Sequence, residues 1–259
     1  MTGAELQALH ERFSALRMPT AREVIREVID VAYREQWPLE QYTRELLDQE
    51  LDGRRERRIE RLMAAAHLPP GKTMQTLDQT RLNARLKRQV KELCSGEFLA
   101  RGDNALLFGL PGKGKTHVAA ATGHELVQQG RQVLFSPAYK IVDRLQRAKR
   151  DLELEAELRR LDRFELLILD DFGYVRQSHH EMEVLFTLLA ERYERRSLMI
   201  TSNLVFSEWD RIFLDPLTTQ SAIERVVHHS VILEFGKDIS SFRADAARER
   251  NKGGTSIDE

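Results

Sequence analysis

The spacing of apolar residues divides the chain into a helical first quarter and a longer part with mixed structure. From Gly3 to about Leu68 the apolar positions recur at helical intervals, among charges of both signs and almost no glycine. Two tripeptides interrupt the pattern, Met18-Pro19-Thr20 and Trp37-Pro38-Leu39. Because proline ends a helix or occupies its first turn, we expect three or four short helices in this region.

From residue 104 onward, short apolar runs alternate with amphipathic stretches, which predicts an α/β fold with a central parallel sheet flanked by helices. Strands are expected over residues 104–108, 132–136, 164–169, 198–202 and 231–235. Helices are expected over residues 116–129 and 180–195, and two helices over the long stretch 138–161.

Pro69-Pro70-Gly71 breaks any helix and predicts a domain boundary. We therefore expect a small all-helical domain over residues 1–68 and a basic linker over 69–103. The main domain would cover residues 104–247. The polar, glycine-rich residues 248–259 are expected to be disordered.

The composition adds few constraints. The hydrophobic content of 41% and charged content of 31% are typical of a soluble globular protein. No run approaches the ~20 apolar residues of a membrane span, and the first residues lack the features of a signal peptide. We therefore expect a cytoplasmic protein without a membrane partner. The net charge of −1 argues against a uniformly basic nucleic-acid binder.

Metal-binding side chains are few. Cys94 is the only cysteine, which excludes an internal disulfide and a zinc site with several cysteines. The pairs His179-His180 and His228-His229 lack the spacing of metal ligands, so we expect them to be polar helix-surface residues.

The most informative motif is GLPGKGKT, which matches the phosphate loop G-x-x-x-x-G-K-[ST] and stands between an expected strand and an expected helix. Its glycines let successive N–H groups face a phosphate, and the helix dipole adds to the attraction. Lys115 would reach the β- and γ-phosphates, and Thr116 would bind Mg²⁺. The expected nucleotide-binding residues are Gly109, Leu110, Pro111, Gly112, Lys113, Gly114, Lys115, Thr116 and His117.

Polar residues follow two of the expected strands. Asp170 ends a buried apolar run, where it would hold Mg²⁺ together with Thr116. Asp171 would orient or deprotonate the attacking water, although aspartate also favours turns after strands. Asn203 would sense the γ-phosphate if its strand lies between the first and the third. Otherwise it is an ordinary asparagine at a strand-to-loop junction.

The order GLPGKGKT, LLILDDFG, ITSN, then Ala222-Ile223-Glu224-Arg225 and His228-His229, resembles the AAA+ ATPases of the IstB/DnaC group, most of all the IstB-type helper ATPases of insertion sequences. Further matching elements are Arg192-Tyr193-Glu194-Arg195, Phe206-Ser207-Glu208-Trp209 and Ser241-Phe242-Arg243. The resemblance implies a P-loop AAA+ ATPase preceded by a helical DNA- or partner-binding domain. It also implies ATP and Mg²⁺ as cofactors, and a homo-oligomer with ATP at its subunit interfaces.

The resemblance also suggests roles for two arginines. Arg225 matches the arginine finger, which acts on the ATP of a neighbouring subunit; by sequence alone it could equally be a surface arginine paired with Glu224 or Glu234. Arg243 occupies a place similar to the second sensor arginine, although the usual helical lid is largely missing after it. Most relatives carry Asp-Glu where this chain has Asp170-Asp171, so we expect slow hydrolysis.

Two basic stretches are candidates for DNA contact. The 138–161 stretch resembles the extra helix of initiator and loader AAA+ proteins, and its charges lie at helical spacing. These basic side chains could instead be balanced by Asp151, Glu153, Glu155 and Glu157. In the same way, Glu56 and Glu60 could balance the arginines of the second basic stretch, residues 54–61. The candidate DNA-binding residues are Lys140, Arg144, Arg147, Lys149 and Arg150 in this stretch, and Arg54, Arg55, Arg57 and Arg58 in the helical domain.

The resemblance implies an ATP-dependent DNA-binding ATPase that oligomerises on duplex target DNA and assists a cognate transposase in target selection and insertion. The alternative is a DnaC-like helicase loader acting on single-stranded DNA. An arginine-rich helical domain without clustered cysteines favours the first. A small-molecule kinase would need an acceptor pocket and a mobile lid, for which no segment is found.

Overall fold

The computed structural model describes residues 2–173, 179–204, 208–209 and 216–236. The chain forms two compact units, Met1–Arg61 and Leu62–Glu259, and each is described by itself. The division falls inside a helix, earlier than the break at Pro69-Pro70-Gly71. None of the helices in the described part combines the length and apolar character that crossing a bilayer requires.

The first unit contains α1 (Gly3–Ala15), α2 (Pro19–Glu35) and the first part of α3 (Leu39–Ala66). Both prolines act as expected, since Pro19 lies in the first turn of α2 and Pro38 directly precedes α3. The expectation of short helices is wrong for α3, which spans 28 residues. No proline interrupts it, and its one glycine, Gly53, is a packing contact: a Cβ there would lie 2.2 Å from Thr20 Oγ1.

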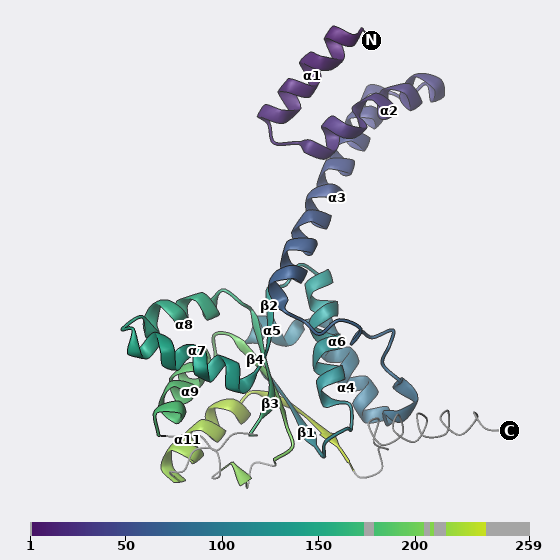
Figure 1. Ribbon diagram of the computed structural model, residues 1–259. Coiled ribbons are helices and arrows are strands. Elements are labelled where there is room, and N and C mark those ends of the chain that lie inside the picture. Colours follow the sequence, from purple (N-terminus) through teal and green to yellow (C-terminus); the bar gives the residue numbers. More distant parts are fainter. Residues whose placement is uncertain (1, 174–178, 205–207, 210–215, 237–259) are drawn as a thin grey trace, which may run out of the picture. The chain divides into compact units, whose positions relative to one another are not determined.

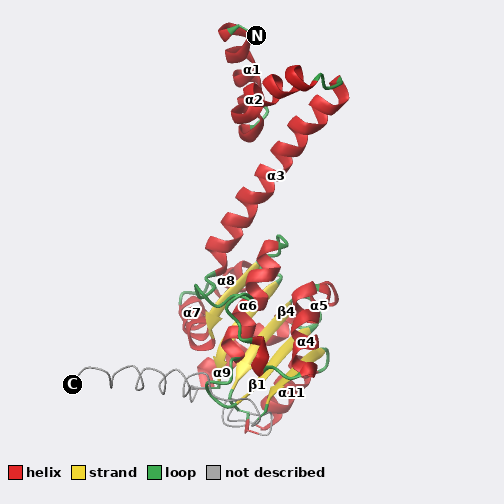
Figure 2. Cartoon of the chain, turned by 90° about the vertical axis from the view of Figure 1, so that its right-hand side faces the viewer, coloured by secondary structure: helices red, strands yellow, loops and turns green. Residues whose placement is uncertain are grey.

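A five-stranded parallel sheet forms the centre of the second unit (Figure 1). The strand order is β2-β3-β4-β1-β5, so the strand that precedes Asn203 does lie between the first and the third. Figure 2 shows the strands side by side. The strands are β1 (Asn104–Gly109), β2 (Val133–Pro137), β3 (Leu166–Phe172), β4 (Ser197–Ser202) and β5 (Ser230–Phe235).

Helices cover both faces of this sheet. Along β1, Ala105 and Leu107 join the apolar core under α4, α5 and α6, whereas Leu106 and Phe108 join the core under α7, α8, α9 and α11. Strands buried on both faces read as continuous apolar runs, which is why the sequence pattern located them. The helices are α4 (Ala84–Ser95), α5 (Glu97–Arg101), α6 (Lys115–Gln128), α7 (Ala138–Arg150), α8 (Leu154–Asp162), α9 (His179–Arg192) and α11 (Pro216–Val227), with a 3₁₀ turn η1 (Gln79–Arg81).

The expected α/β fold is confirmed, and the stretch 138–161 forms two helices, α7 and α8. A buried arginine joins several of these elements. The guanidinium of Arg192 donates to the carbonyls of Leu161 at 3.1 Å, Phe164 at 2.9 Å and Ser197 at 2.9 Å. Burial lowers the pKa of Arg192 to about 10, so this side chain remains charged at neutral pH.

Candidate nucleotide-binding site

The phosphate loop connects the carboxyl end of β1 to the amino end of α6. Gly114 precedes the helix with φ of 95°, a left-handed conformation that glycine adopts without strain. Gly109 has φ of 148°, and a Cβ there would lie 2.5 Å from the Phe235 carbonyl oxygen. The glycines at these positions therefore meet steric demands of the loop. The amino end of α6 supplies the N–H groups that an anion needs.

Lys115 is buried at the start of α6. Its ammonium donates to the carbonyl oxygens of Gly109 at 2.6 Å and Leu110 at 3.0 Å. These bonds hold the positive charge against the loop, where it can compensate the charge of a phosphate group. The next residue but one, His117, has Nε2 3.1 Å from both the Thr73 carbonyl oxygen and Thr76 Oγ1, which ties α6 to the preceding linker.

A hydrogen-bonded group links the phosphate loop to two strands. Asp170, at 7% exposure, accepts from the Thr116 hydroxyl at 2.8 Å and from the Thr201 hydroxyl at 2.6 Å, both on Oδ1. Thr116 is the second residue of α6, Asp170 lies near the end of β3, and Thr201 lies on β4. A hydroxyl and a carboxylate at this separation can coordinate the same hard cation, so the donor set fits Mg²⁺.

Thr201 was not among the expected site residues. It contacts both aspartates: its hydroxyl donates to the Asp170 carboxylate, and its Oγ1 accepts from the backbone N–H of Asp171 at 3.0 Å. The signal was present in the sequence, because Thr201 stands inside the ITSN motif that carries Asn203. Local pattern alone did not indicate that its side chain faces Asp170.

Asp171 lies where β3 departs from regular pairing with β4. Its φ is 55°, a left-handed conformation that aspartate tolerates better than most residues, and its side chain is exposed. The Asp171 carboxylate is therefore exposed, whereas the carboxylate of the neighbouring Asp170 is buried.

Asn203 directly follows β4, next to the strand that carries Asp170. Its Oδ1 atom is buried and has no hydrogen-bond partner among the described residues. A buried acceptor without a donor is costly, so this oxygen fits a water or ligand that donates to it. The structure thus brings Lys115, Thr116, Asp170 and Asn203 to one edge of the sheet.

Arg225 is not part of the hydrogen-bonded group around Asp170. It lies on α11, with its guanidinium carbon 4.6 Å from the ring centroid of Phe186 on α9. Its Nη1 atom is buried without a hydrogen-bond partner among the described residues. Arg243, together with Phe206 and Ser207 of the matching motif, lies outside the described residues.

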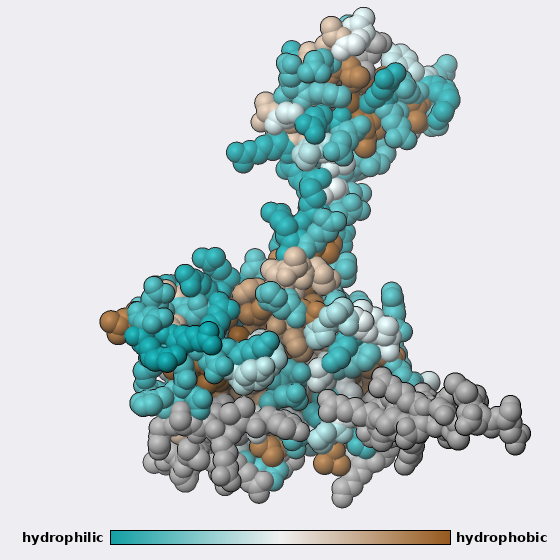
Figure 3. All heavy atoms as spheres, viewed as in Figure 1, coloured by the Kyte–Doolittle hydropathy of each residue, from teal (hydrophilic) through white to brown (hydrophobic). Residues whose placement is uncertain are grey.

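The charged positions of α7 fall into two groups. Arg144 forms an ion pair with Glu157, and Lys149 forms one with Glu183. The side chains of Lys140, Arg147 and Arg150 are exposed. Figure 3 shows a strongly hydrophilic surface over α7 and α8. Of the four carboxylates that could have balanced the helix, Glu157 pairs with Arg144, and Glu183 is an additional partner from α9.

In the first unit, arginines of the basic stretch hold α2 against α3. Glu50 is 3% exposed and accepts from Arg54 Nε at 2.8 Å and from the Ala21 backbone N–H at 3.0 Å. Arg57 donates to Thr20 Oγ1 at 2.7 Å and forms an ion pair with Glu50 at 3.4 Å. The sequence analysis offered Glu56 and Glu60 as alternative partners for this basic stretch; the structure pairs Arg54 and Arg57 with Glu50.

Burial opposes ionisation of Glu50, but hydrogen bonds from Arg54 and the Ala21 N–H outweigh it and lower the pKa of this carboxyl below its ordinary value. Arg54 and Arg57 thus have structural roles, whereas Arg55 is exposed and Arg58 has a further interaction within the protein.

Comparison with known proteins places these features in context. Residues 12–250 match the family of IstB-like ATP binding proteins. An insertion sequence ATP-binding protein of Sinorhizobium fredii is 44% identical over 92% of this chain and 79% of its own length. The insertion sequence IS21 ATP-binding protein of Pseudomonas aeruginosa is 33% identical over 96% of this chain and 91% of its own length.

Among solved structures, the DnaC helicase loader superposes with a TM-score of 0.52 at 20% identity, covering 59% of this chain and 91% of its own. At this identity the likeness concerns the fold alone. It agrees with the fold that the sequence predicts, a central parallel sheet flanked by helices.

Proposed function

The chain belongs to the family of IstB-like ATP binding proteins, and from this premise we propose that it is a Mg²⁺-dependent ATPase that binds duplex DNA and assists a transposase in choosing a target. The names of its relatives connect them with ATP and with insertion sequences. The hydrolytic step, the DNA and the transposase are the parts that we propose for this chain.

The observation that carries the ATPase proposal is the pair of hydrogen bonds that Asp170 Oδ1 accepts from Thr116 and Thr201. These bonds support a cation-binding position between Thr116 of the phosphate loop and Asp170 of β3. A bound Mg²⁺ would neutralise charge on the phosphate oxygens. Lys115 would hold the β- and γ-phosphates, Asp171 would accept a proton from the attacking water, and the Asn203 amide would orient that water.

The Arg225 geometry supports an assembly with shared ATP sites. The Arg225 guanidinium stacks on the Phe186 ring, and its Nη1 has no hydrogen-bond partner among the described residues. This nitrogen could therefore donate to another group. A guanidinium stacked on a ring can move to a phosphate at a smaller cost than one fixed in an ion pair. We propose that Arg225 reaches the ATP of a neighbouring copy, which would make hydrolysis depend on oligomerisation.

Duplex DNA is the proposed ligand of α7, where Lys140, Arg147 and Arg150 are exposed. Contacts with phosphates carry no sequence information, which suits a protein that must accept many target sites. Each contact would release condensed counterions, so affinity should fall steeply with salt.

Nucleotide binding is tested with Lys115→Ala in a fluorescent-ATP titration. We expect loss of binding, because the ammonium and the loop N–H groups together compensate the triphosphate charge. Parental affinity in this variant would contradict the site. The exposed Lys91→Ala, on α4, is the control and should bind as the parent does.

The DNA proposal is tested by anisotropy with matched single- and double-stranded oligonucleotides at two salt concentrations, with and without ATP. Duplex binding that requires ATP and weakens with salt is expected. A clear preference for single strands would favour a helicase loader instead, and no ATP-dependent DNA binding would contradict both. Transposase assistance is tested by adding the transposase encoded beside this gene, if one is present, to ATP-loaded protein on DNA.

A further inference from the structure

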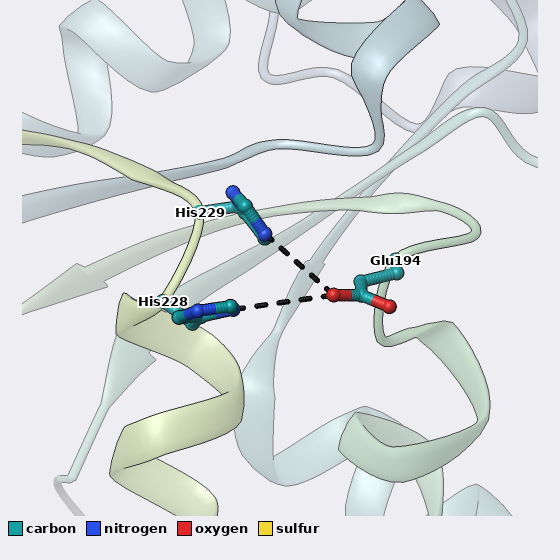
Figure 4. A group of neighbouring side chains, drawn as sticks. All are labelled: Glu194, His228 and His229. Carbon is teal, nitrogen blue, oxygen red and sulfur yellow. Dashed lines mark ion pairs between the residues drawn. The ribbon is translucent and has the colours of Figure 1, made fainter.

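Three side chains that could bind a metal ion meet on the surface of the second unit, away from the nucleotide site. Glu194 lies in the turn after α9, and His228 and His229 lie in the turn between α11 and β5. Their potential ligand atoms all lie within 4.8 Å of one another. Glu194 Oε1 is 3.6 Å from His229 Nε2 and 4.0 Å from His228 Nδ1. Figure 4 shows both imidazoles facing this carboxylate oxygen.

The backbone holds both turns in place. The His229 carbonyl accepts from the Asn104 N–H at 2.6 Å, and the His228 N–H donates to the Glu224 carbonyl at 2.9 Å. Glu194 has φ of 56°, and its backbone packs against Gly102, where a Cβ would lie 3.1 Å away. The three side chains therefore start from anchored positions, which lowers the entropy that a ligand would have to overcome.

We propose that Glu194, His228 and His229 form a Zn²⁺ site with one coordination position left to solvent. Two imidazole nitrogens and one carboxylate oxygen are a donor set that zinc prefers, and three protein ligands are typical of open zinc sites. Tetrahedral bonds of about 2.0–2.1 Å would place the ligand atoms about 3.3 Å apart. The two shorter separations exceed this value by less than about 1 Å, which rotation of exposed side chains can close.

The Tyr193 hydroxyl is a competitor for one ligand atom. It lies 2.9 Å from His228 Nδ1, the nitrogen that faces Glu194. Zinc binding would replace this hydrogen bond. Removing the hydroxyl should therefore not weaken zinc binding.

This site is separate from the proposed Mg²⁺ position. Glu194 and the two histidines lie near Ser197 and Ser230, where β4 and β5 begin, whereas the phosphate loop follows the other end of β1. Among the described residues it is the one group of three such side chains with this proximity. The sequence analysis expected His228 and His229 to be helix-surface residues; the structure places them, exposed, in the turn after α11 and brings Glu194 to them from a distant turn.

The test uses the full chain without an affinity tag or nucleotide, titrated with Zn²⁺ by calorimetry and with Co²⁺ by visible absorption. We expect saturable binding of one ion, with the intense Co²⁺ bands of a four-coordinate site. At a hundredfold excess over the dissociation constant, Zn²⁺ should raise the melting temperature by roughly 5 °C. Absence of saturable binding would overturn the proposal.

Variants locate the ion. His228→Ala, His229→Ala and Glu194→Gln should each weaken zinc binding at least about tenfold. The exposed His180→Ala is the matched control and should bind as the parent does. Tyr193→Phe should bind at least as tightly as the parent. Binding retained after combined replacement of both histidines, or weakened by Tyr193→Phe, would overturn the assignment. Melting without zinc confirms that each variant is folded, and the three single ligand variants provide independent tests.

Discussion

Thr201 donates its hydroxyl proton to Oδ1 of Asp170 at 2.6 Å, the same carboxylate oxygen that accepts from Thr116. Thr201 also accepts from the backbone N–H of Asp171. One threonine on β4 therefore positions both acidic residues at the end of β3. Because Thr201 bonds both aspartates, small changes at Thr201 should affect the proposed chemistry.

Thr201→Val removes the hydroxyl with little change in volume. We expect a loss of about 1–3 kcal/mol in stability, because the Asp171 N–H and one lone pair of Asp170 lose their partner. ATP hydrolysis should fall more than ATP affinity does. Thermal melting and ATPase assays check this, with Thr201→Ser as the control that keeps the hydroxyl. A valine variant with parental melting and turnover would contradict the positioning role.

Asp171→Asn should leave ATP affinity near the parental value and slow hydrolysis, because an amide cannot accept a proton from water. Asp171→Glu should hydrolyse ATP at least as fast as the parent, since the longer side chain reaches further toward the attacking water. Single-turnover hydrolysis and nucleotide titration measure the two effects. If Asp171→Asn turns over at the parental rate, another residue activates the water.

Arg225→Ala should bind ATP and lose most hydrolysis, with a reduction on the order of 10³ if the guanidinium acts as an arginine finger. Mixing this variant with Lys115→Ala subunits should restore part of the activity, because each supplies the half-site that the other lacks. ATPase assays of mixtures at varied ratios measure the effect. Mixtures no more active than the separate variants would exclude action on a neighbour's nucleotide.

The basic side chains of α7 form two sets, one that pairs with carboxylates of the protein and one that is exposed and could contact DNA. Combined replacement of Lys140, Arg147 and Arg150 by alanine should weaken binding to every sequence and flatten the salt dependence by up to ~0.9 for each phosphate that the variant no longer neutralises. Replacement of Arg144 and Lys149, which already pair with Glu157 and Glu183, should have a smaller effect. Equal effects of the two sets in anisotropy titrations would contradict this division.

Glu50 should make the first unit sensitive to acid. Its pKa is lowered in the folded protein, so its contribution to stability is present above the unfolded pKa of about 4.3 and is lost as pH falls through the folded value. Glu50→Gln should cost about 1–3 kcal/mol at neutral pH, since Arg54 and Arg57 lose a charged partner. It should also flatten the pH dependence below about pH 5.

Helical circular dichroism of the full chain across pH checks this prediction. Glu56→Gln is the matched control on an exposed position of α3. Equal acid sensitivity of the parent and the Glu50 variant would show that the buried carboxylate does not set the stability of this unit.

The sequence alone predicted the five strands of the second unit, the helices α6 to α9 and the phosphate loop between β1 and α6, whereas α4 and α5 fall in the stretch expected to be a linker and α11 was not predicted. The correct predictions follow from short-range rules. A buried parallel strand is a continuous apolar run, and the phosphate loop is a contiguous peptide whose glycines and lysine act on one neighbouring group. The two prolines likewise marked where α2 and α3 begin, because the effect of proline on a helix is local.

Tertiary structure alone decided which distant side chains meet. Asp170 and Thr201 are 31 residues apart, and Thr116 and Asp170 are 54 apart, so the order of the strands and the packing of α6 on the sheet bring these groups together. For the same reason Glu50 and Arg57 of α3 reach the Ala21 N–H and Thr20 Oγ1 of α2, and Glu194 meets His228 and His229 across two turns. Periodicity specifies which face of an element is buried, whereas the partner across that face depends on how the elements pack.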